Sequence, residues 1–309
     1  MTKTKIVIDC DPGHDDAVAI LFAARHLELL GITTVHGNST VEHTTRNALA
    51  ILELAGLDVP VASGCGEPLI QRRTAHGRTG LDGADLPAPG RQPLDTHAID
   101  FLIETAHRHR GELVVAAIGP QTNLALALRR EPRLKDWLRE ITIMGGSTGL
   151  GNVTAAAEFN ILLDPEAAWA VFNSGAQLRM VGLNVTRSTA LDAADIARLK
   201  SAGRKVADTI ADLLGFYLAR QRERGLDVTP MHDVCAIVPH VEPGLIEYVH
   251  TRVDIELTGT HTRGMTVCDL RLRGPGAASQ GPAPNAMVAI AANGRVLLER
   301  VMATLLSYA

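Results

Sequence analysis

The stretch that decides the fold is Ile6-Val7-Ile8-Asp9-Cys10-Asp11-Pro12-Gly13-His14-Asp15-Asp16. Its first three residues form an apolar β-branched run typical of a buried parallel strand, and residues 17–21 begin an amphipathic helix. The residues between them therefore form a strand-to-helix crossing. Because ligands of open α/β sheets bind beyond the carboxyl ends of the strands, we expect a functional site here.

Four carboxylates are concentrated in this crossing. Strand alternation points Asp9 and Asp11 the same way, whereas Asp15 and Asp16 open the first helical turn. Two like charges about 4 Å apart repel by roughly 4 kcal/mol at an effective dielectric constant near 20, so the group needs a cation or raised pKa values. Oxygen ligands without a nearby cysteine pair favour calcium or magnesium over zinc. Capping of the helix by Asp15 and Asp16 is the simpler alternative, but it explains neither Asp9 nor Asp11.

Composition limits the classes of function. The chain has 309 residues, 46% of them hydrophobic, and a formal net charge of -4. This charge gives no electrostatic footprint for nucleic acid or for an anionic membrane, so we expect a small-molecule partner. Four scattered cysteines form no C-x-x-C pair, and neither a signal peptide nor a long apolar span is evident, which predicts a cytoplasmic protein. With no linker or internal repeat, we expect one domain over residues 1–309.

Downstream of the crossing, strand patterns alternate with helical patterns. The first are a strand at 30–36, helices at 41–55 and 96–110, and a strand at 113–118. Further strands are predicted at 140–144, 178–183, 249–257, 265–272 and 286–291, and further helices at 193–201, 205–222 and 294–303. Residues 63–95, rich in Gly, Pro and Arg, are predicted to form a long loop. This order is typical of βαβ units and predicts an α/β fold with a mainly parallel sheet.

Short motifs along nearly the whole chain point to one family. They are D-C-D-P-G-H-D-D at 9–16, G-N at 37–38, H-G-x-[ST]-G-[LM] at 76–81, G-P-x-[ST]-N at 119–123, G-N-x-[ST]-x-x-A-E-F-N at 151–160, H-D-x-x-A at 232–236 and R-G-x-T at 263–266. Together, and in this order, they resemble the nucleoside hydrolases, the inosine-uridine-preferring ribohydrolase family. The resemblance implies an open, mainly parallel sheet with helices on both faces.

The resemblance also implies a reaction and a metal. The expected reaction is calcium-dependent hydrolysis of the N-glycosidic bond of ribonucleosides, which gives ribose and the free base. The implied calcium ligands are Asp11, Asp16, Asp233 and the backbone carbonyl of Ile118, with Asp11 also acting as general base. Asp9 is expected to support the ligands from behind rather than to bind the ion. Family members suggest a homodimer or homotetramer.

The substrate contacts implied by the resemblance involve amides, carboxylates and histidines. Those expected at the sugar are Asp15, Asn38, Asn152, Glu158 and Asn160, with Met144 beside it, and those expected near the leaving base are His76 and His232. A polyhydroxylated ligand needs such paired donors and acceptors. His232 is assigned a catalytic role because a histidine can donate a proton or hydrogen bond to the departing base.

Aromatic content bears on which base leaves. Only 3% of the residues are aromatic, and neither Trp137 nor Trp169 occupies a place suited to stacking on a purine. We therefore expect uridine or cytidine, or the inosine-uridine pair, to be preferred over guanosine. The roles of Tyr217 and Gln221, in the least securely matched segment, stay open at this point.

Two alternatives compete with this interpretation. Residues 145–149 match G-x-S-x-G, the nucleophile elbow of serine esterases, with Ser147 as nucleophile and His232 as base. An elbow runs directly into a helix, however, and residues 150–154 are helix-breaking. The second alternative is a non-catalytic protein that binds a sugar or nucleoside through the same calcium pocket.

Overall fold

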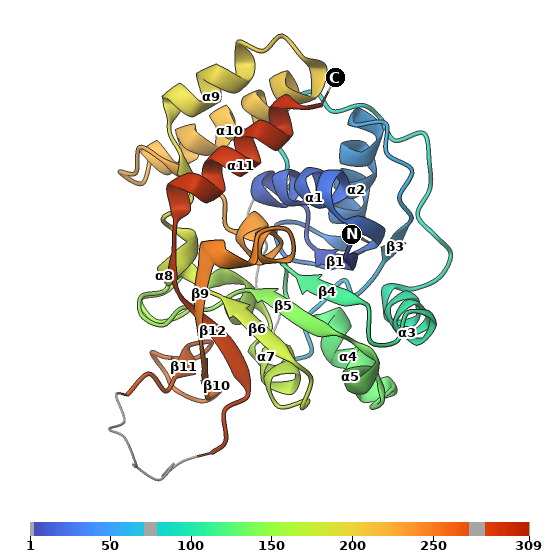
Figure 1. Ribbon diagram of the computed structural model, residues 1–309, viewed down its shortest axis with the longest axis vertical. Helices are drawn as coiled ribbons and strands as arrows, with labels where there is room; N and C mark the ends of the chain where they lie inside the picture. Colours follow the sequence, from blue (N-terminus) through green and yellow to red (C-terminus); the bar gives the residue numbers. More distant parts are fainter. Residues whose placement is uncertain (1–2, 71–78, 272–281, 309) are drawn as a thin grey trace.

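A mainly parallel sheet crosses the molecule, whose computed structural model describes residues 3–70, 79–271 and 282–308 (Figure 1). Within these ranges eight strands form the sheet, and each neighbouring pair is parallel except the last. In spatial order they are β3 (Val61–Ser63), β2 (Glu28–Thr34), β1 (Lys5–Cys10), β4 (Val114–Ala117), β5 (Glu140–Met144), β6 (Leu178–Val181), β12 (Ala286–Ala292) and β9 (Ile246–Thr251). Two small antiparallel pairs lie outside it: β7 (Ala190–Leu191) with β8 (Thr229–Pro230), and β10 (Val253–Ile255) with β11 (Thr266–Cys268).

Helices cover both faces of this sheet (Figure 1). One face carries α1 (His14–His26), α2 (Val41–Leu54), α9 (Ala193–Lys200), α10 (Lys205–Arg222) and α11 (Gly294–Leu306); the other carries α3 (Ala98–Arg108), α4 (Thr122–Arg130), α5 (Leu134–Trp137) and α7 (Pro165–Phe172). Strand alternation explains the two cores, because Ile6 and Ile8 pack into the first and Val7 into the second. The predicted α/β fold with helices on both faces is confirmed.

Short helices join the strand ends. They are α6 (Phe159–Leu163), α8 (Leu183–Thr186) and the 3₁₀ turns η1 (Asp233–Ala236), η2 (Val238–His240) and η3 (Pro243–Leu245). The loop between β5 and α6, residues 145–158, contains no helix. Ser147 is therefore not followed by the helix that a nucleophile elbow requires, which removes the structural basis of the esterase alternative.

One predicted strand is two strands. The apolar pattern at 249–257 is continuous, but the chain changes partners within it: β9 pairs with β12, whereas β10 pairs with β11. The Asn285 side chain binds the backbone where the partner changes: its Oδ1 accepts the Val253 N–H and its Nδ2 donates to the Val253 carbonyl. The strand predicted at 265–272 is also shorter, at Thr266–Cys268, and its last residue lies outside the described residues.

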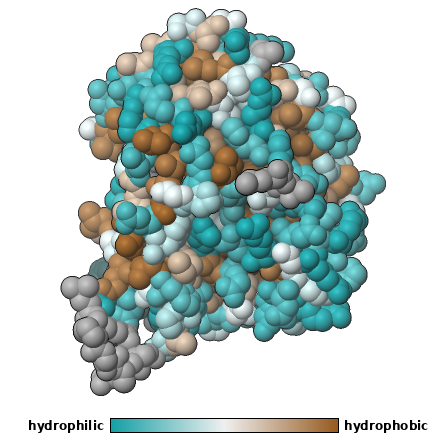
Figure 2. Space-filling model, viewed as in Figure 1, coloured by the Kyte–Doolittle hydropathy of each residue, from teal (hydrophilic) through white to brown (hydrophobic). Residues whose placement is uncertain are grey.

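Two elements have the bounds that the sequence predicts. The strand at 140–144 and the helix at 205–222 have the predicted bounds. The long loop predicted at 63–95 begins one residue later, because Ser63 ends β3, and its described parts contain no helix and one isolated bridge, from Leu94 to Ala62. None of the helices within the described ranges is both long and apolar enough to cross a membrane. Figure 2 shows hydrophobic side chains interspersed with hydrophilic ones on the viewed face.

Candidate active site and metal centre

Asp9, at the end of β1, binds neighbouring elements rather than the carboxylate cluster. Its Oδ1 accepts hydrogen bonds from Thr33 Oγ1 on β2 (2.6 Å) and from Asn123 Nδ2 at the start of α4 (2.8 Å). Burial raises its pKa to about 6, although both hydrogen bonds act against that rise. Asp9 thus holds β1, β2 and α4 together directly behind the crossing.

Asp11 is held tightly between two glycines. The backbone N–H of Asn38 donates to Asp11 Oδ2 (2.6 Å), and Asn38 Nδ2 donates to the Asp11 carbonyl (3.0 Å). A Cβ at Gly119 would lie 2.5 Å from Asp11 Oδ1, and one at Gly37 would overlap Oδ2. Only residues without a side chain fit there. Burial and the neighbouring Asp16 raise the pKa of Asp11 well above its usual value.

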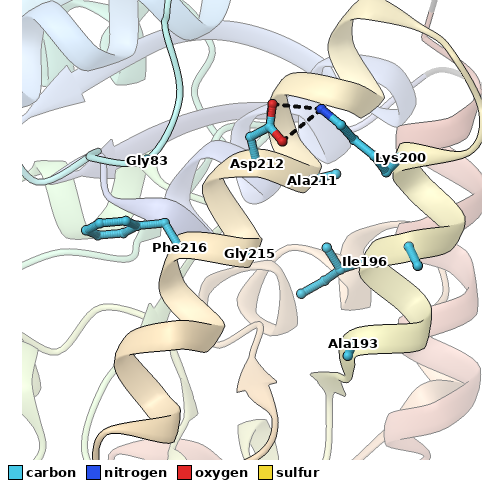
Figure 3. A pocket seen from close by; sticks show the side chains of 9 residues that line it. Gly83, Ala193, Ile196, Lys200, Ala211, Asp212, Gly215 and Phe216 are labelled. Carbon is cyan, nitrogen blue, oxygen red and sulfur yellow. Dashed lines mark hydrogen bonds and ion pairs between the residues drawn. The ribbon is translucent and has the colours of Figure 1, made fainter.

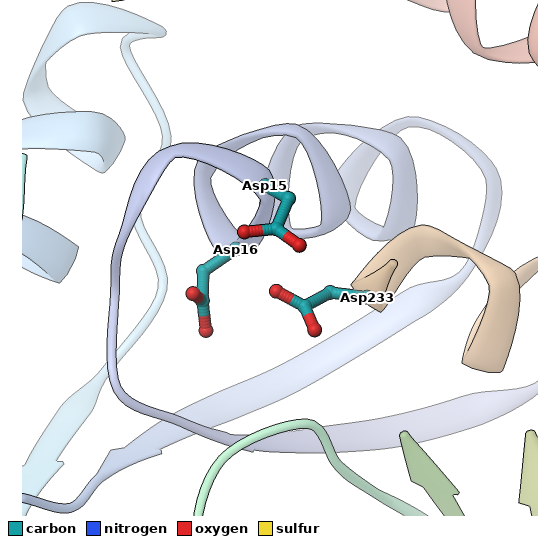
Figure 4. Close-up of side chains that lie close together, drawn as sticks. All are labelled: Asp15, Asp16 and Asp233. Carbon is teal, nitrogen blue, oxygen red and sulfur yellow. The ribbon is translucent and has the colours of Figure 1, made fainter. Parts of the chain in front are cut away.

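Three carboxylates of the site point toward one another (Figure 4), and this cluster includes Asp15, predicted for the sugar, but not Asp11, predicted as a metal ligand. Asp15 and Asp16, from the first turn of α1, and Asp233, at the start of η1, each place an oxygen within 4.8 Å of the others. Asp16 also caps its helix, because Oδ2 accepts the Gly13 N–H (2.9 Å). The capping alternative is therefore right for Asp16 but incomplete, since capping uses only one of its oxygens.

The cluster has the properties of a cation site. Within the described residues no N–H or hydroxyl donor reaches the buried Oδ1 of Asp16, whose carboxylate faces the carboxyl group of Asp233. Burial, and then the charge of Asp15, raise the pKa of Asp16 to about 7, and the same two causes raise the pKa of Asp233. An uncompensated oxygen among crowded carboxylates fits a hard divalent cation, whose charge would remove the repulsion.

Asn160 and Glu158 fix the next two strand ends. Asn160 Nδ2 donates to the carbonyls of Ile118, after β4 (2.8 Å), and Met144, at the end of β5 (3.1 Å). Glu158 is buried, with Oε1 accepting the Asn160 N–H (2.9 Å) and Oε2 the Gly146 N–H (3.0 Å). Burial raises the pKa of Glu158 to about 7 despite these bonds. The structure thus brings four predicted site residues together at the edge of the sheet where the parallel strands end, here called the carboxyl edge: Ile118, Met144, Glu158 and Asn160.

Two predicted substrate residues are not placed there. Asn152 is exposed, and its Oδ1 accepts the Phe159 N–H (3.0 Å) at the start of α6. His76 lies outside the described residues.

His232 lies next to the cluster, immediately before η1. Its backbone N–H donates to Asp15 Oδ2 (3.3 Å), and its Nδ1 lies 2.7 Å from Thr186 Oγ1. Burial lowers the pKa of His232. Ser147 instead holds Thr266, whose hydroxyl bonds both the N–H and the carbonyl of Ser147 (2.8 and 2.6 Å). The Ser147 hydroxyl accepts the Gly149 N–H (3.1 Å), and within the described residues no hydrogen bond joins it to His232, so the esterase pair is not formed.

An aromatic cluster that the sequence did not predict surrounds His14. Its ring stacks on Phe216 and Tyr217 of α10 (centroids 5.7 and 5.3 Å apart), and its Nε2 lies 2.8 Å from the Asp82 carbonyl. Gln221 lies beside the Tyr217 hydroxyl. His14 belongs to the D-C-D-P-G-H-D-D motif, which was the available signal.

A groove of about 420 Å³ lies between α9, α10 and Gly83 (Figure 3). Its lining includes Ala197, Gly215 and Phe216, and a Lys200–Asp212 ion pair (2.8 Å) closes one side. None of the carboxylates of the acidic cluster lines it. We therefore place the chemistry at the carboxyl edge of the sheet and not in this groove.

Comparison with known proteins bears on this site. A family model described as inosine-uridine preferring nucleoside hydrolase matches residues 6–299. The chain belongs to this family. This nucleoside hydrolase is 40% identical, over 276 residues, to the pyrimidine-specific ribonucleoside hydrolase RihB of Escherichia coli. The aligned region covers 87% of this chain and 88% of RihB.

Solved structures agree with the assignment. The plant nucleoside hydrolase PpNRh1 has a TM-score of 0.90 and 33% identity, with 99% of each chain covered. The purine-preferring ribonucleoside hydrolase from Gardnerella vaginalis has a TM-score of 0.90 and 31% identity, with 98% of each chain covered. The protein is accordingly a ribonucleoside hydrolase, and the serine esterase alternative is wrong.

Proposed function

We propose that this nucleoside hydrolase acts on pyrimidine ribonucleosides and that calcium is its metal. Its relative RihB, at 40% identity, is named pyrimidine-specific, whereas the Gardnerella vaginalis enzyme, at 31%, is named purine-preferring. The two tryptophans support the same preference: Trp137 is buried beneath Arg110 and Arg133, and Trp169 lies on α7. Neither tryptophan is available to stack on a purine at the acidic cluster.

The observation that carries the metal proposal is the buried Asp16 Oδ1, which lies among carboxylates and accepts no N–H or hydroxyl hydrogen bond within the described residues. We assign the calcium to Asp11, Asp16, Asp233 and the Ile118 carbonyl. That carbonyl already accepts one hydrogen bond, from Asn160 (2.8 Å), and a second lone pair is left for an ion. A bound divalent ion supplies positive charge that orients and acidifies water.

Asp11 is the general base in this proposal. Burial and Asp16 raise its pKa in the cation-free protein, and bound calcium would lower it, so this role rests on the position of Asp11 beside the assigned ion. The Asn38 N–H (2.6 Å) and the flanking glycines leave its carboxylate one position, so the accepting oxygen is pre-oriented. Asn38 therefore holds the general base, Asp11, in place, and we assign its sugar contact to the same loop.

The sugar is bound by the carboxyl edge. Asn160 uses Nδ2 on two carbonyls, which leaves its Oδ1 as the atom available to a hydroxyl. Glu158 fixes that amide through the Asn160 N–H. Asp15, whose Oδ2 also accepts the His232 N–H, offers its carboxylate to a second hydroxyl. His232 then stands on the side where the base departs, and it assists that departure by hydrogen bonding.

Further parts of the proposal concern the whole chain. The match over 6–299 supports one domain spanning residues 1–309. We also propose a homodimer or homotetramer, on the resemblance to the family alone, and a cytoplasmic location, on the four scattered cysteines.

Release of free base from a panel of uridine, cytidine, inosine and guanosine tests the proposal. We expect kcat/KM for uridine or cytidine to exceed that for guanosine, and His232→Ala to lower kcat more than it raises KM. Guanosine as the best substrate would show that the base preference is wrong. Tight binding without base release would instead support the non-catalytic nucleoside-binding alternative.

A further inference from the structure

The Thr186 hydroxyl is the partner of one ring nitrogen of His232. Thr186 ends α8 and is fully buried, and its Oγ1 lies 2.7 Å from His232 Nδ1. A neutral imidazole has one N–H and one bare nitrogen, so the partner of Nδ1 decides which form is present. Among the described residues Nε2 has no hydrogen-bond partner in the protein. Nε2 is therefore the atom available to a substrate.

The direction of this hydrogen bond follows from the surroundings of Thr186. Within the described residues, its hydroxyl contacts no acceptor other than His232. If the imidazole donated from Nδ1, the hydroxyl hydrogen would be left buried and unpaired, which is unfavourable. Donation by the hydroxyl to Nδ1 satisfies both groups. The ring hydrogen is then on Nε2.

Thr186 is held firmly enough to set the ring orientation. The Leu183 N–H, at the start of α8, donates to the Gly146 carbonyl (2.9 Å). Asn184 Nδ2 donates to the Ala289 carbonyl on β12 (2.9 Å). The Met231 N–H donates to the Thr189 carbonyl (2.8 Å), which ties the chain before His232 to the chain after α8. Both partners of the hydrogen bond therefore belong to one fixed unit.

We propose that Thr186 is a positioning residue that donates to His232 Nδ1 and so keeps the ring hydrogen on Nε2, as a hydrogen-bond donor to the departing base. This inference rests on the proposed role of His232. In the step, water oxygen bonds to the anomeric carbon, and the electrons of the C–N bond leave with the base. The water proton goes to Asp11, and the base anion, stabilised by the Nε2–H, takes its own proton from solvent. No proton leaves the imidazole ring.

The test compares Thr186→Val, which keeps the shape, with Thr186→Ser, which keeps the hydroxyl. The substrates are uridine and p-nitrophenyl riboside, whose nitrophenolate leaves without help. At about pH 8 an unperturbed histidine is neutral. We expect Thr186→Val to lower kcat for uridine about 10- to 100-fold, the range for one hydrogen bond to a charged group, with KM little changed. Turnover of p-nitrophenyl riboside should stay at the wild-type rate, and Thr186→Ser should keep both activities.

Each failure has a separate meaning. The positioning role is overturned if Thr186→Val lowers kcat equally for both substrates, or if it does not lower kcat for uridine. Wild-type protein that releases no base overturns the proposed function, and a His232→Ala variant with unchanged uridine turnover overturns only the role of His232. Nitrogen-15 spectra of histidine-labelled protein give a readout independent of activity, with His232→Ala used for assignment. The proposal requires the hydrogen on Nε2, and a signal from Nδ1–H contradicts it.

Discussion

Removing the divalent cation should make the stability of the fold depend on pH through Asp16. Burial and the charge of Asp15 raise the pKa of Asp16 from 3.8 to about 7 in the cation-free protein. A carboxyl whose pKa is higher in the folded chain stabilises the fold below the unfolded pKa, and this stability is lost as the pH rises through the folded pKa. The loss therefore falls between about pH 4 and about pH 7.

The size of the effect can be worked out in two ways. A rise of about three pKa units corresponds to about 4 kcal/mol of folding free energy. Two unit charges at the 4.8 Å limit of the cluster repel by about 3 kcal/mol at an effective dielectric constant near 20. Both values are a large part of the roughly 5 to 15 kcal/mol that stabilises a typical fold.

Urea unfolding of chelator-stripped protein at about pH 5 and about pH 8 measures this loss. Other buried carboxyl groups of the site also have raised pKa values, so we expect the wild type to lose more than the Asp16 contribution alone. The Asp16→Asn variant should lose about 4 kcal/mol less than the wild type and be the more stable protein at the higher pH. Added calcium should reverse that order. Asp212→Asn, which breaks an exposed ion pair with Lys200, is the control and should follow the wild type. Equal wild-type stability at both pH values would refute the reasoning.

Three further changes address the site directly. Asp11→Asn should lower uridine turnover by about 10² to 10⁴-fold in steady-state kinetics, because it removes the proposed base, and near wild-type turnover with metal retained would exclude Asp11 from the mechanism. Gly119→Ala places a Cβ 2.5 Å from Asp11 Oδ1 and should weaken calcium binding about 10- to 100-fold in calorimetry. Glu158→Gln removes a buried carboxyl whose pKa is raised to about 7, so the variant should lose less unfolding free energy than the wild type between about pH 5 and about pH 8, and an unchanged pH dependence would contradict this reasoning.

Local sequence predicts the strand-to-helix crossing because its two halves carry different periodicities. A β-branched run gives β1, and the acidic first turn gives the start of α1. The same reasoning places Asn38 and Ile118 at strand ends, where the parallel sheet gathers them near Asp11. The apolar pattern at 249–257 does not show where β9 ends and β10 begins. At that point the backbone of Val253 is hydrogen-bonded by Asn285, which is distant in sequence.

Side-chain partners are the part that sequence patterns do not predict. Asn123 matches the G-P-x-[ST]-N motif at the start of α4, where a helix cap is the simplest interpretation, yet its amide binds Asp9. Thr186 lies in no motif used for the prediction, and only the folded chain brings it to His232. Such contacts join elements distant in sequence, so neither periodicity nor spacing encodes them.

Uracil release from uridine by chelator-stripped protein, followed as calcium is added back, tests most directly whether the carboxylate cluster performs the hydrolysis. We predict that activity is lost on stripping and returns to its full value near about one equivalent of calcium per chain. Full activity in stripped protein, or no recovery when calcium is restored to a folded chain, would contradict the metal-dependent mechanism.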